Sequence, residues 1–148
     1  MERYHILTIN PGSTSTKIAV FDNNTPVFIK SLKHSADDLK PFSKIVDQYQ
    51  FRKKAILDEL AASDIDVNSL NVIVGRGGLI KPIPSGVYEV NEAMMKDLLS
   101  GVMGQHASNL GGLIAADIAS SLSGVKAYIA DPVVVDEMQD VARIAGNP

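Results

Sequence analysis

The sequence contains no cysteine and no tryptophan, and only 5% of its residues are aromatic. Without cysteine there can be no disulfides, thiolate zinc sites, iron–sulfur clusters or cysteine nucleophiles, so a metal must be held by oxygen atoms or by the three histidines. So few aromatic side chains leave little material for stacking on bases or sugars. The 14 basic and 17 acidic residues give a net charge of −3, which creates no field that favours nucleic acid. Composition therefore argues against a nucleic-acid partner.

Long apolar runs are lacking as well. No stretch of the sequence approaches the roughly 20 apolar residues that span a bilayer. The strand-like segment that follows residues 1–5 is too short for the apolar region of a signal peptide. We therefore expect no membrane partner and a cytoplasmic location. With 148 residues, 45% of them apolar, the chain has the size of one domain that buries a core.

Strand-like and helix-like segments follow one another along the chain. The first three strand-like segments are joined by tight turns, which predicts an antiparallel meander. The run Ser35-Ala36-Asp37-Asp38 has the form of a helix start, and apolar residues at helical spacing up to residue 62 predict one long helix or two short ones. Strands are expected at 4–9, 17–22, 26–32, 70–75 and 125–130, with a shorter one at 87–90; further helices are expected from Asn91 through Leu99, at 110–122 and at 136–145.

The main elements give the order β-β-β-α-β-α-β-α. A meander followed by two more strands with intervening helices is a ribonuclease-H-like α/β arrangement, whose parallel strands end at one crevice. The chain stops at Gly146-Asn147-Pro148 without a terminal strand. We therefore expect residues 1–148 to form one lobe of a larger protein, with the carboxyl-terminal lobe absent.

A turn rich in hydroxyl groups follows the first strand. The run from Asn10 to Lys17 packs one glycine and four consecutive hydroxyl side chains between two strands, with a lysine at its end. Such a turn presents N–H donors, hydroxyls and a positive charge to a polyphosphate. It is not a Walker loop, because the glycine and lysine are out of register and a strand follows. On residue types alone, an ordinary hairpin turn is an equal alternative. The predicted phosphate-binding residues are Asn10, Gly12, Ser13, Thr14, Ser15, Thr16 and Lys17.

The same run resembles the amino-terminal signature of the acetokinase family, the acetate and butyrate kinases, within the actin, sugar kinase and Hsp70 superfamily. Two later runs, Val74-Gly75-Arg76-Gly77-Gly78-Leu79 and Lys81-Pro82-Ile83-Pro84-Ser85-Gly86-Val87-Tyr88, resemble the butyrate kinase branch. The resemblance extends over essentially the whole chain. It implies that residues 1–148 are the amino-terminal lobe of a two-lobe kinase.

Three further residues are candidates for catalysis. Arg76 follows a buried strand among glycines, where its guanidinium could bind a carboxylate or phosphoryl group in bidentate fashion or could be a solvated charge. His106 precedes the helix expected at 110–122, and Asp131 ends the last strand; on the residues alone, a structural histidine and a simple strand stop are the alternatives. The resemblance implies that Arg76 contacts the acyl substrate and the phosphoryl group. It also implies that His106 stabilises that group and that Asp131 is a magnesium-associated catalytic aspartate.

The resemblance further implies reversible phosphoryl transfer between ATP and a short-chain carboxylate, butyrate or a branched analogue, giving an acyl phosphate and ADP. A carboxylate is already ionised at neutral pH, so the reaction needs positioning and charge neutralisation rather than a general base. Asn10 and Asp131 are the expected magnesium residues, acting where needed through water. We expect an apolar acyl pocket around Ile80, Ile83 and Val87. Family members are homo-oligomers, which implies the same for the full-length protein.

Two other interpretations stay open. Another phosphotransferase of the superfamily, a sugar kinase or an exopolyphosphatase, would share the hairpin but not the Gly-Arg-Gly-Gly loop. A noncatalytic isolated lobe is the second, because this superfamily binds adenosine mainly through its carboxyl-terminal domain and closes both lobes over the substrate. We therefore expect weak or no nucleotide binding, and no kinase activity, from the 148-residue chain alone.

Overall fold

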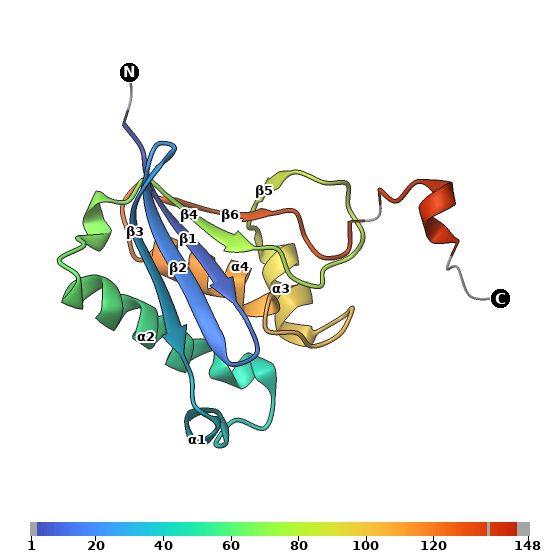
Figure 1. Cartoon of the computed structure of the whole chain (residues 1–148), viewed down its shortest axis with the longest axis horizontal. Helices are drawn as coiled ribbons and strands as arrows, with labels where there is room; N and C mark the ends of the chain where they lie inside the picture. Colours follow the sequence, from blue (N-terminus) through green and yellow to red (C-terminus); the bar gives the residue numbers. More distant parts are fainter. Residues whose placement is uncertain (1–2, 136, 145–148) are drawn as a thin grey trace.

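The fold is built on one mixed β-sheet (Figure 1). The computed structural model describes residues 3–135 and 137–144. Within them, a six-stranded sheet has the spatial order β3-β2-β1-β4-β6-β5. The strands are β1 (His5–Pro11), β2 (Ser15–Asp22), β3 (Thr25–Lys33), β4 (Val72–Arg76), β5 (Val87–Glu89) and β6 (Lys126–Ala130).

Strand pairing gives the sheet its polarity. Strands β1, β2 and β3 are antiparallel neighbours, whereas β1, β4 and β6 run parallel to one another. Strand β5 pairs with β6 antiparallel at the edge of the sheet. The carboxyl ends of the three parallel strands therefore lie along one edge, where open α/β sheets place their ligands. This topology confirms the predicted meander and the ribonuclease-H-like arrangement.

The longest helices pack together with the sheet. Helix α4 (Asn109–Ser120) lies behind the sheet in Figure 1 and contacts β1, β4 and β6, while α2 (Tyr49–Ala62) and α3 (Glu92–Ser100) pack against α4. The segment expected to form one long helix or two short ones forms α1 (Ala36–Leu39) and α2, with the 3-10 turn Ile45–Gln48 before α2. Within the described ranges, no helix is both long and apolar enough to cross a membrane.

Two predicted helix starts are confirmed by their caps. The Ser35 hydroxyl accepts the N–H of Asp38, and the Asp38 carboxylate accepts the N–H of Ser35 in return. The Asn91 side chain accepts the N–H of Met94 at 2.9 Å. Each cap satisfies N–H groups that the first turn of a helix leaves without an internal partner.

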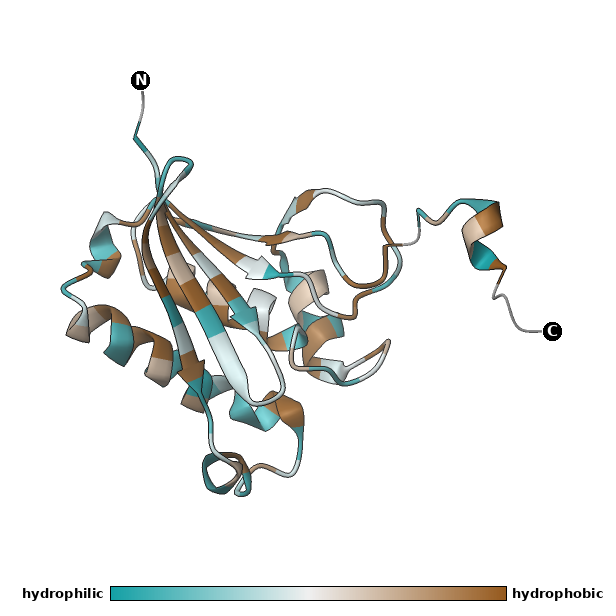
Figure 2. Ribbon diagram, viewed as in Figure 1, coloured by the Kyte–Doolittle hydropathy of each residue, from teal (hydrophilic) through white to brown (hydrophobic). Residues whose placement is uncertain are grey.

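The core fills the space between the sheet and α4. Leu7 and Ile9 of β1 point toward the helices and are buried, whereas Thr8 and Asn10 point to the opposite face. Helix α4 contributes an almost continuous buried surface that includes Ile114, as its apolar spacing predicts. The hydropathy colouring of Figure 2 shows apolar segments recurring along these strands and helices.

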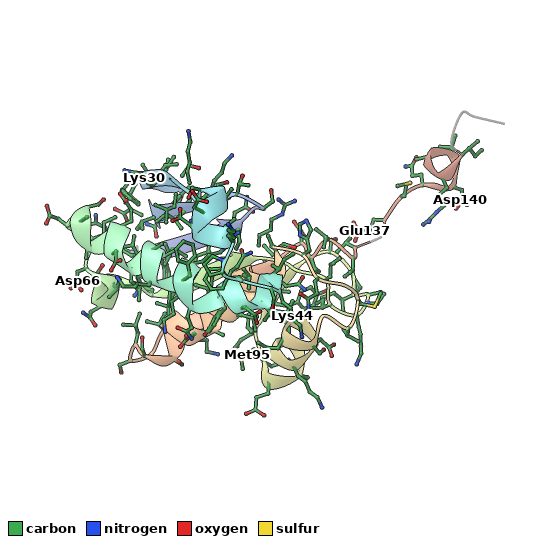
Figure 3. The ribbon with its side chains drawn as sticks, turned by 90° about the horizontal axis from the view of Figure 1, so that it is seen from below. Lys30, Lys44, Asp66, Met95, Glu137 and Asp140 are labelled. Carbon is green, nitrogen blue, oxygen red and sulfur yellow. The ribbon has the colours of Figure 1, made fainter. Side chains whose placement is uncertain are left out.

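The helix expected at 136–145 is wrong within the described residues. Only the 3-10 turn Asp140–Arg143 forms there, and Figure 3 shows Glu137 and Asp140 on a segment that extends away from the sheet. Ile144 is 75% exposed, so this segment has no core to pack against. Short helices gain most of their stability from such packing. Both ends of the expected helix lie outside the described residues.

Candidate functional site

A cavity opens where β1 and β4 end. Its volume is about 250 Å³, and its lining brings Asn10 and Arg76 together. Asn10 is half-buried and Arg76 is exposed, which leaves the guanidinium accessible to a ligand. The remaining lining residues are Thr8, Ile9, Val74, Gly75 and Ala130. The cavity therefore combines a largely apolar wall with one amide and one guanidinium.

The β1–β2 hairpin presents polar groups on the same face of the sheet as this cavity. Asn10 pairs with Lys17 across the ladder, and paired residues of neighbouring strands project to the same side. Ser15 lies two positions before Lys17 and shares its face. Ser13 and Thr14 are exposed at the hairpin tip. One ammonium group thus lies beside Asn10, and the hydroxyl groups follow from Ser15 to the hairpin tip.

Two residues of the predicted phosphate-binding set, Thr16 and Gly12, use polar groups for hydrogen bonds within the protein. Thr16 is fully buried, and its hydroxyl lies 2.9 Å from His34 Nε2. The N–H of Gly12 donates to the Ser15 carbonyl at 2.7 Å. Thr16 is buried because side chains alternate along a strand: β2 begins at Ser15, and its second residue, Thr16, points to the core. The Thr16 hydroxyl is therefore left out of the phosphate-binding groups proposed below.

Sequence reasoning missed Arg52 of α2, which holds the hairpin from the core side. This fully buried guanidinium donates to the carbonyls of Gly12 at 2.8 Å, Ser13 at 2.9 Å and Ser15 at 3.0 Å. Gln48 accepts two more hydrogen bonds from it, at 2.8 and 3.0 Å. Burial lowers the pKa of Arg52. Two lysines follow it in the sequence and it lies 40 residues beyond Gly12, so no local pattern indicates this contact.

His34 completes this buried polar group. It is 5% exposed and packs edge-on against Phe51, with ring centroids 5.2 Å apart. Burial lowers the pKa of His34, the charge of Arg52 lowers it further, and Asp38 opposes both effects. The neutral imidazole is therefore the form that the folded protein favours. Its burial and its contacts give His34 a structural role.

Glycines allow α4 to approach the end of β4. A Cβ atom on Gly75 would lie 2.3 Å from the carbonyl carbon of Gly111, and one on Gly111 would lie 2.7 Å from the carbonyl oxygen of Arg76. These distances are far shorter than real Cβ contacts, so both positions require glycine. The backbone at Arg76 is thus fixed against the first turn of α4.

Asn109, at the start of α4, joins the loop that follows Arg76 to the loop that carries His106. Its side chain is buried, with Oδ1 accepting the N–H of Leu79 at 2.8 Å and Nδ2 donating to the carbonyl of Gly104 at 3.0 Å. The amide therefore ties the glycine loop after β4 to the loop before α4. The sequence does not indicate this role, since an asparagine at the start of a helix is an ordinary cap residue.

The His106 ring is oriented by its own loop. The N–H of Ser108 donates to Nδ1 at 3.2 Å, and the Ser108 hydroxyl lies 2.8 Å from the same atom. Because Nδ1 accepts a backbone N–H, the ring proton of the neutral form is assigned to Nε2. The exposed imidazole therefore has an N–H donor available for an anion, although His106 does not line the cavity beside Arg76.

Asp131 ends β6 in the left-handed backbone region, with φ of 41°. Its Oδ1 accepts the N–H of Gly86 at 3.0 Å, and its own N–H donates to the Gly86 carbonyl at 3.0 Å. Aspartate is one of the few residues besides glycine that tolerate this conformation. Asp131 thus stops the strand and also fixes the loop before β5. Its second carboxylate oxygen has no hydrogen-bond partner among the described residues.

The residues expected to form an acyl pocket do not gather beside Arg76. Ile80 is buried in the core, whereas Val87 of β5 is 68% exposed. Neither lines the cavity of about 250 Å³. The apolar groups that do lie there come instead from the ends of the strands, including Val74 and Ala130.

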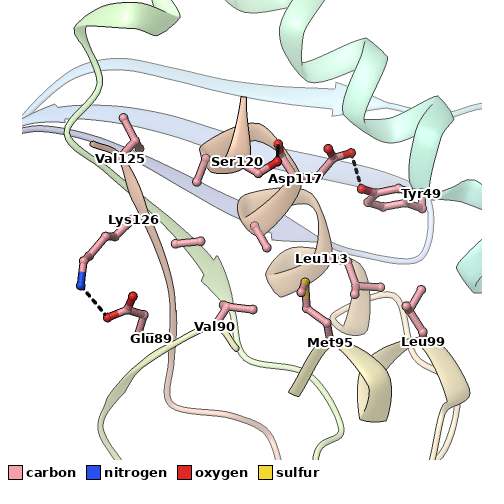
Figure 4. A pocket seen from close by; sticks show the side chains of 13 residues that line it. Tyr49, Glu89, Val90, Met95, Leu99, Leu113, Asp117, Ser120, Val125 and Lys126 are labelled. Atoms are coloured by element: carbon pink, nitrogen blue, oxygen red, sulfur yellow. Dashed lines mark hydrogen bonds and ion pairs between the residues drawn. The ribbon is translucent and has the colours of Figure 1, made fainter. Parts of the chain in front are cut away.

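A second cavity, of about 530 Å³, lies between α3, α4 and β6 (Figure 4). Apolar side chains such as Met95 and Leu113 line it, and it contains none of the predicted site residues. At its margin the Tyr49 hydroxyl donates to Asp117, as the dashed line shows. Burial and this hydrogen bond raise the pKa of Tyr49. These polar groups join α2 to α4, so we assign them a structural role.

Solved structures of acetate kinases share this fold. The structure resembles the acetate kinase of Entamoeba histolytica with a TM-score of 0.53, covering 97% of this chain and 39% of that one at 16% identity. It resembles the Porphyromonas gingivalis acetate kinase with a TM-score of 0.52, covering 86% of this chain and 37% of that one at 13% identity. The chain thus has the fold of the matched part of these acetate kinases.

Sequence comparison gives the particular relatives. The chain is 57% identical to butyrate kinase 1 of Clostridium acetobutylicum, covering 97% of this chain and 40% of that protein. It is 55% identical to a protein of Bacteroides thetaiotaomicron named "probable butyrate kinase", with the same coverage of 97% and 40%. No family model matches the chain. The chain is therefore a homologue of butyrate kinases; it corresponds to their amino-terminal part and spans about 40% of their length.

Proposed function

We propose that this chain is the amino-terminal lobe of a cytoplasmic butyrate kinase, which transfers a phosphoryl group reversibly between ATP and a short-chain carboxylate to give an acyl phosphate and ADP. The observation that carries this proposal is the cavity that Arg76 and Asn10 share beside the hydroxyl-rich hairpin. The butyrate kinase relatives supply the reaction and the class of acid. We further propose that the full-length protein is a homo-oligomer.

Arg76 is the central group of the proposed site. Its exposed guanidinium can bind the acid carboxylate or the transferring phosphoryl group through two parallel N–H donors. The apolar wall beside it, including Val74 and Ala130, suits the hydrocarbon chain of a small acid. Because the carboxylate is already ionised, these contacts have to position it and do not have to deprotonate it.

The phosphate chain of ATP is assigned to the hairpin. Ser13, Thr14 and Ser15 supply hydroxyl and amide groups, and Lys17 supplies a positive charge on the same face as Asn10. The charge on a planar phosphoryl group in flight is spread over its oxygen atoms. Donors from the hairpin, Arg76 and the Nε2–H of His106 would neutralise it from different sides.

The residues at the strand ends would hold a magnesium ion only when phosphate oxygens of the substrate complete its coordination shell. The described residues contain no group of three or more histidine or acidic side chains that could hold a metal ion. Magnesium in kinases commonly takes one or two carboxylates and completes its shell with phosphate oxygens and water. Asp131 keeps one carboxylate oxygen available, and Asn10 offers an amide oxygen, so these two residues would hold the ion, in part through water. The ion would supply charge neutralisation.

A hydroxamate assay for acyl phosphate tests the proposal. Acetate, propionate, butyrate and isobutyrate are each supplied with ATP and Mg²⁺ to the protein that joins this chain to the carboxyl-terminal part found in its relatives. We expect acyl phosphate from butyrate or isobutyrate. Failure with all four acids would refute the proposed function and direct attention to sugars and polyphosphates.

A further inference from the structure

Arg52 is a buried cation whose hydrogen-bond partners are all neutral. Its guanidinium makes six contacts to five oxygen atoms of the hairpin and of the 3-10 turn that precedes its helix. None of these atoms belongs to a carboxylate. The acceptors are the carbonyls of Gly12, Ser13 and Ser15, the Thr16 hydroxyl at 3.1 Å, and the Gln48 amide oxygen.

This arrangement sets the direction of the peptide groups at the hairpin tip. In a trans peptide the carbonyl of one residue and the N–H of the next point in opposite directions, and the described residues contain no cis peptide bonds. Arg52 draws the carbonyls of Gly12 and Ser13 inward, so the N–H groups of Ser13 and Thr14 point outward. Two successive outward N–H groups form the kind of concavity that binds anions.

The charge of Arg52 acts in the same direction. Removing a cation from water without an opposing charge is costly, and neutral dipoles offset only part of that cost. The nearby imidazole of His34 does not compensate it, since it carries no negative charge. An anion bound on the outer side of the hairpin would be attracted through the peptide groups to this cation. The hairpin is thus prepared for an anion by a residue that the anion does not touch.

We propose that Arg52 is a positioning residue for the polyphosphate site, which holds the Ser13 and Thr14 N–H groups outward and supplies a positive charge behind them. This inference rests on the assignment of the hairpin to the phosphate chain in the proposed function. It assigns to α2 a role that neither the hairpin sequence nor the reaction chemistry indicates. Gln48, which accepts from two nitrogens of Arg52, orients the guanidinium.

An NMR titration tests the inference on the 148-residue chain itself. The ¹⁵N-labelled chain is titrated with sodium tripolyphosphate at constant ionic strength, and the amide resonances of Ser13 and Thr14 are followed. We expect saturable shifts at both amides in the wild type. In Arg52→Lys, which keeps the charge but replaces the separated nitrogens of the planar guanidinium by a single one, we expect the apparent Kd to rise at least tenfold.

Two further variants separate positioning from stability. Gln48→Met leaves the guanidinium in place without its orienting acceptor, and we expect a smaller rise in Kd, about threefold. If Arg52→Lys does not fold, the Kd of Gln48→Met decides whether the guanidinium positions the hairpin. Lys53→Met removes a cation from the next position of α2, where it pairs with Asp117 at 2.7 Å, and should leave the Kd within twofold of wild type.

The outcomes of this titration are independent of catalysis. Wild-type affinity in folded Arg52→Lys, or in Gln48→Met if the lysine variant does not fold, would overturn the inference, as would the absence of tripolyphosphate shifts at Ser13 and Thr14 in the wild type. Loss of acyl phosphate formation with an intact, Arg52-dependent titration would refute only the proposed function. In the longer protein, Arg52→Lys should raise the KM for ATP and leave the KM for butyrate unchanged. If Arg52 had only a structural role, the variant would have a smaller active fraction, and both KM values would stay unchanged.

Discussion

At the residue scale, the alternation of side chains along β2 divides the polar side chains of the hairpin into two sets. Ser15 and Lys17 lie on the open face, whereas Thr16 points inward to His34 and Arg52. The sequence shows four consecutive hydroxyl residues without indicating which face each one takes. The outer set is available to a ligand, and the inner one stabilises the shape of the turn.

Arg76 is the residue whose replacement should affect catalysis most. In the longer protein, Arg76→Ala should lower kcat/KM for butyrate by about 100-fold or more, because it removes donors aimed at charge that develops in the transition state. Arg76→Lys should recover only part of this activity, since it keeps the charge but loses the planar fork. Steady-state hydroxamate kinetics measure both effects.

A surface cation provides the control for Arg76. Lys126 pairs with Glu89 at 2.9 Å on the exposed edge of the sheet, and Lys126→Ala should leave kcat/KM unchanged. Because Arg76 is itself exposed, the free energy of unfolding of its variants should lie within about 0.5 kcal/mol of the wild-type value. Wild-type turnover in folded Arg76→Ala would contradict the assignment.

His34 should make stability depend on pH near neutrality. Burial and the charge of Arg52 lower its pKa in the folded state, so the unfolded chain binds the proton more readily. The resulting stabilisation is complete above the unfolded pKa of about 6.5 and is lost as the pH falls below it. Urea unfolding of the wild type between about pH 8 and pH 5.5 should therefore show a decreasing free energy of unfolding, in a range above the titration of most carboxylates.

The His34→Gln variant isolates this effect. Glutamine offers a hydrogen-bonding group near Thr16 but does not titrate. The free energy of unfolding of His34→Gln should change less than that of the wild type over the same pH range. Equal slopes for the two proteins would show that His34 does not cause the dependence.

At the element scale, the site depends on how closely α4 approaches β4. The backbones meet at Gly75 and Gly111, and Asn109 adds side-chain bonds to the loops on both sides. A close approach between a helix and a strand fixes the backbone of Arg76 without using its side chain. The accuracy of the proposed site therefore comes from the packing of two rigid elements.

Alanine at Gly111 tests this contact. The added Cβ would lie 2.7 Å from the Arg76 carbonyl oxygen, so α4 must move away from β4. We expect Gly111→Ala to lower the free energy of unfolding by about 2 kcal/mol, measured by urea denaturation. Gly12→Ala is the matched control, because its Cβ would make only an ordinary contact, 3.5 Å from the Ser15 carbonyl oxygen. A neutral Gly111→Ala would contradict the close packing.

The same elements show how far sequence reasoning reaches. The meander, the buried strand before Arg76 and α4 were predictable, because each carries a local pattern of β-branched or periodic apolar residues. The helix expected at 136–145 was wrong, since the sequence does not show whether a core is available to pack against it. The contact between Arg52 and the hairpin was missed because it joins segments that are distant in the chain and adjacent only in the fold.

At the scale of the whole molecule, the proposed site is open on one side. Asn10, Lys17 and Arg76 share a sheet face opposite the one that α4 covers. Phosphoryl transfer to a carboxylate needs water to be excluded, because water would otherwise compete as the acceptor. The match covers 40% of the length of butyrate kinase 1, so that relative is about two and a half times as long as the matched segment. We infer that the additional part of such a protein closes over this face.

The isolated chain should therefore be inactive. With ATP, Mg²⁺ and butyrate, the 148-residue chain should form no acyl phosphate above background, while the protein that includes the carboxyl-terminal part turns over. Isothermal titration calorimetry should likewise show only weak ATP binding by the chain alone, because the hairpin contacts the phosphates and leaves the adenosine unbound. Turnover of butyrate by the purified chain would contradict this prediction and show that one lobe suffices.

The most direct test of the central claim is a ³¹P NMR spectrum of the longer protein incubated with ATP, Mg²⁺ and butyrate. A carboxylate kinase converts ATP to ADP and produces the resonance of an acyl phosphate. The account predicts that both appear together, and that both form about 100-fold more slowly, or slower still, in Arg76→Ala. Release of inorganic phosphate without acyl phosphate, or an unchanged ATP spectrum, would contradict the proposal that Arg76 and the hairpin form a site for phosphoryl transfer to a carboxylate.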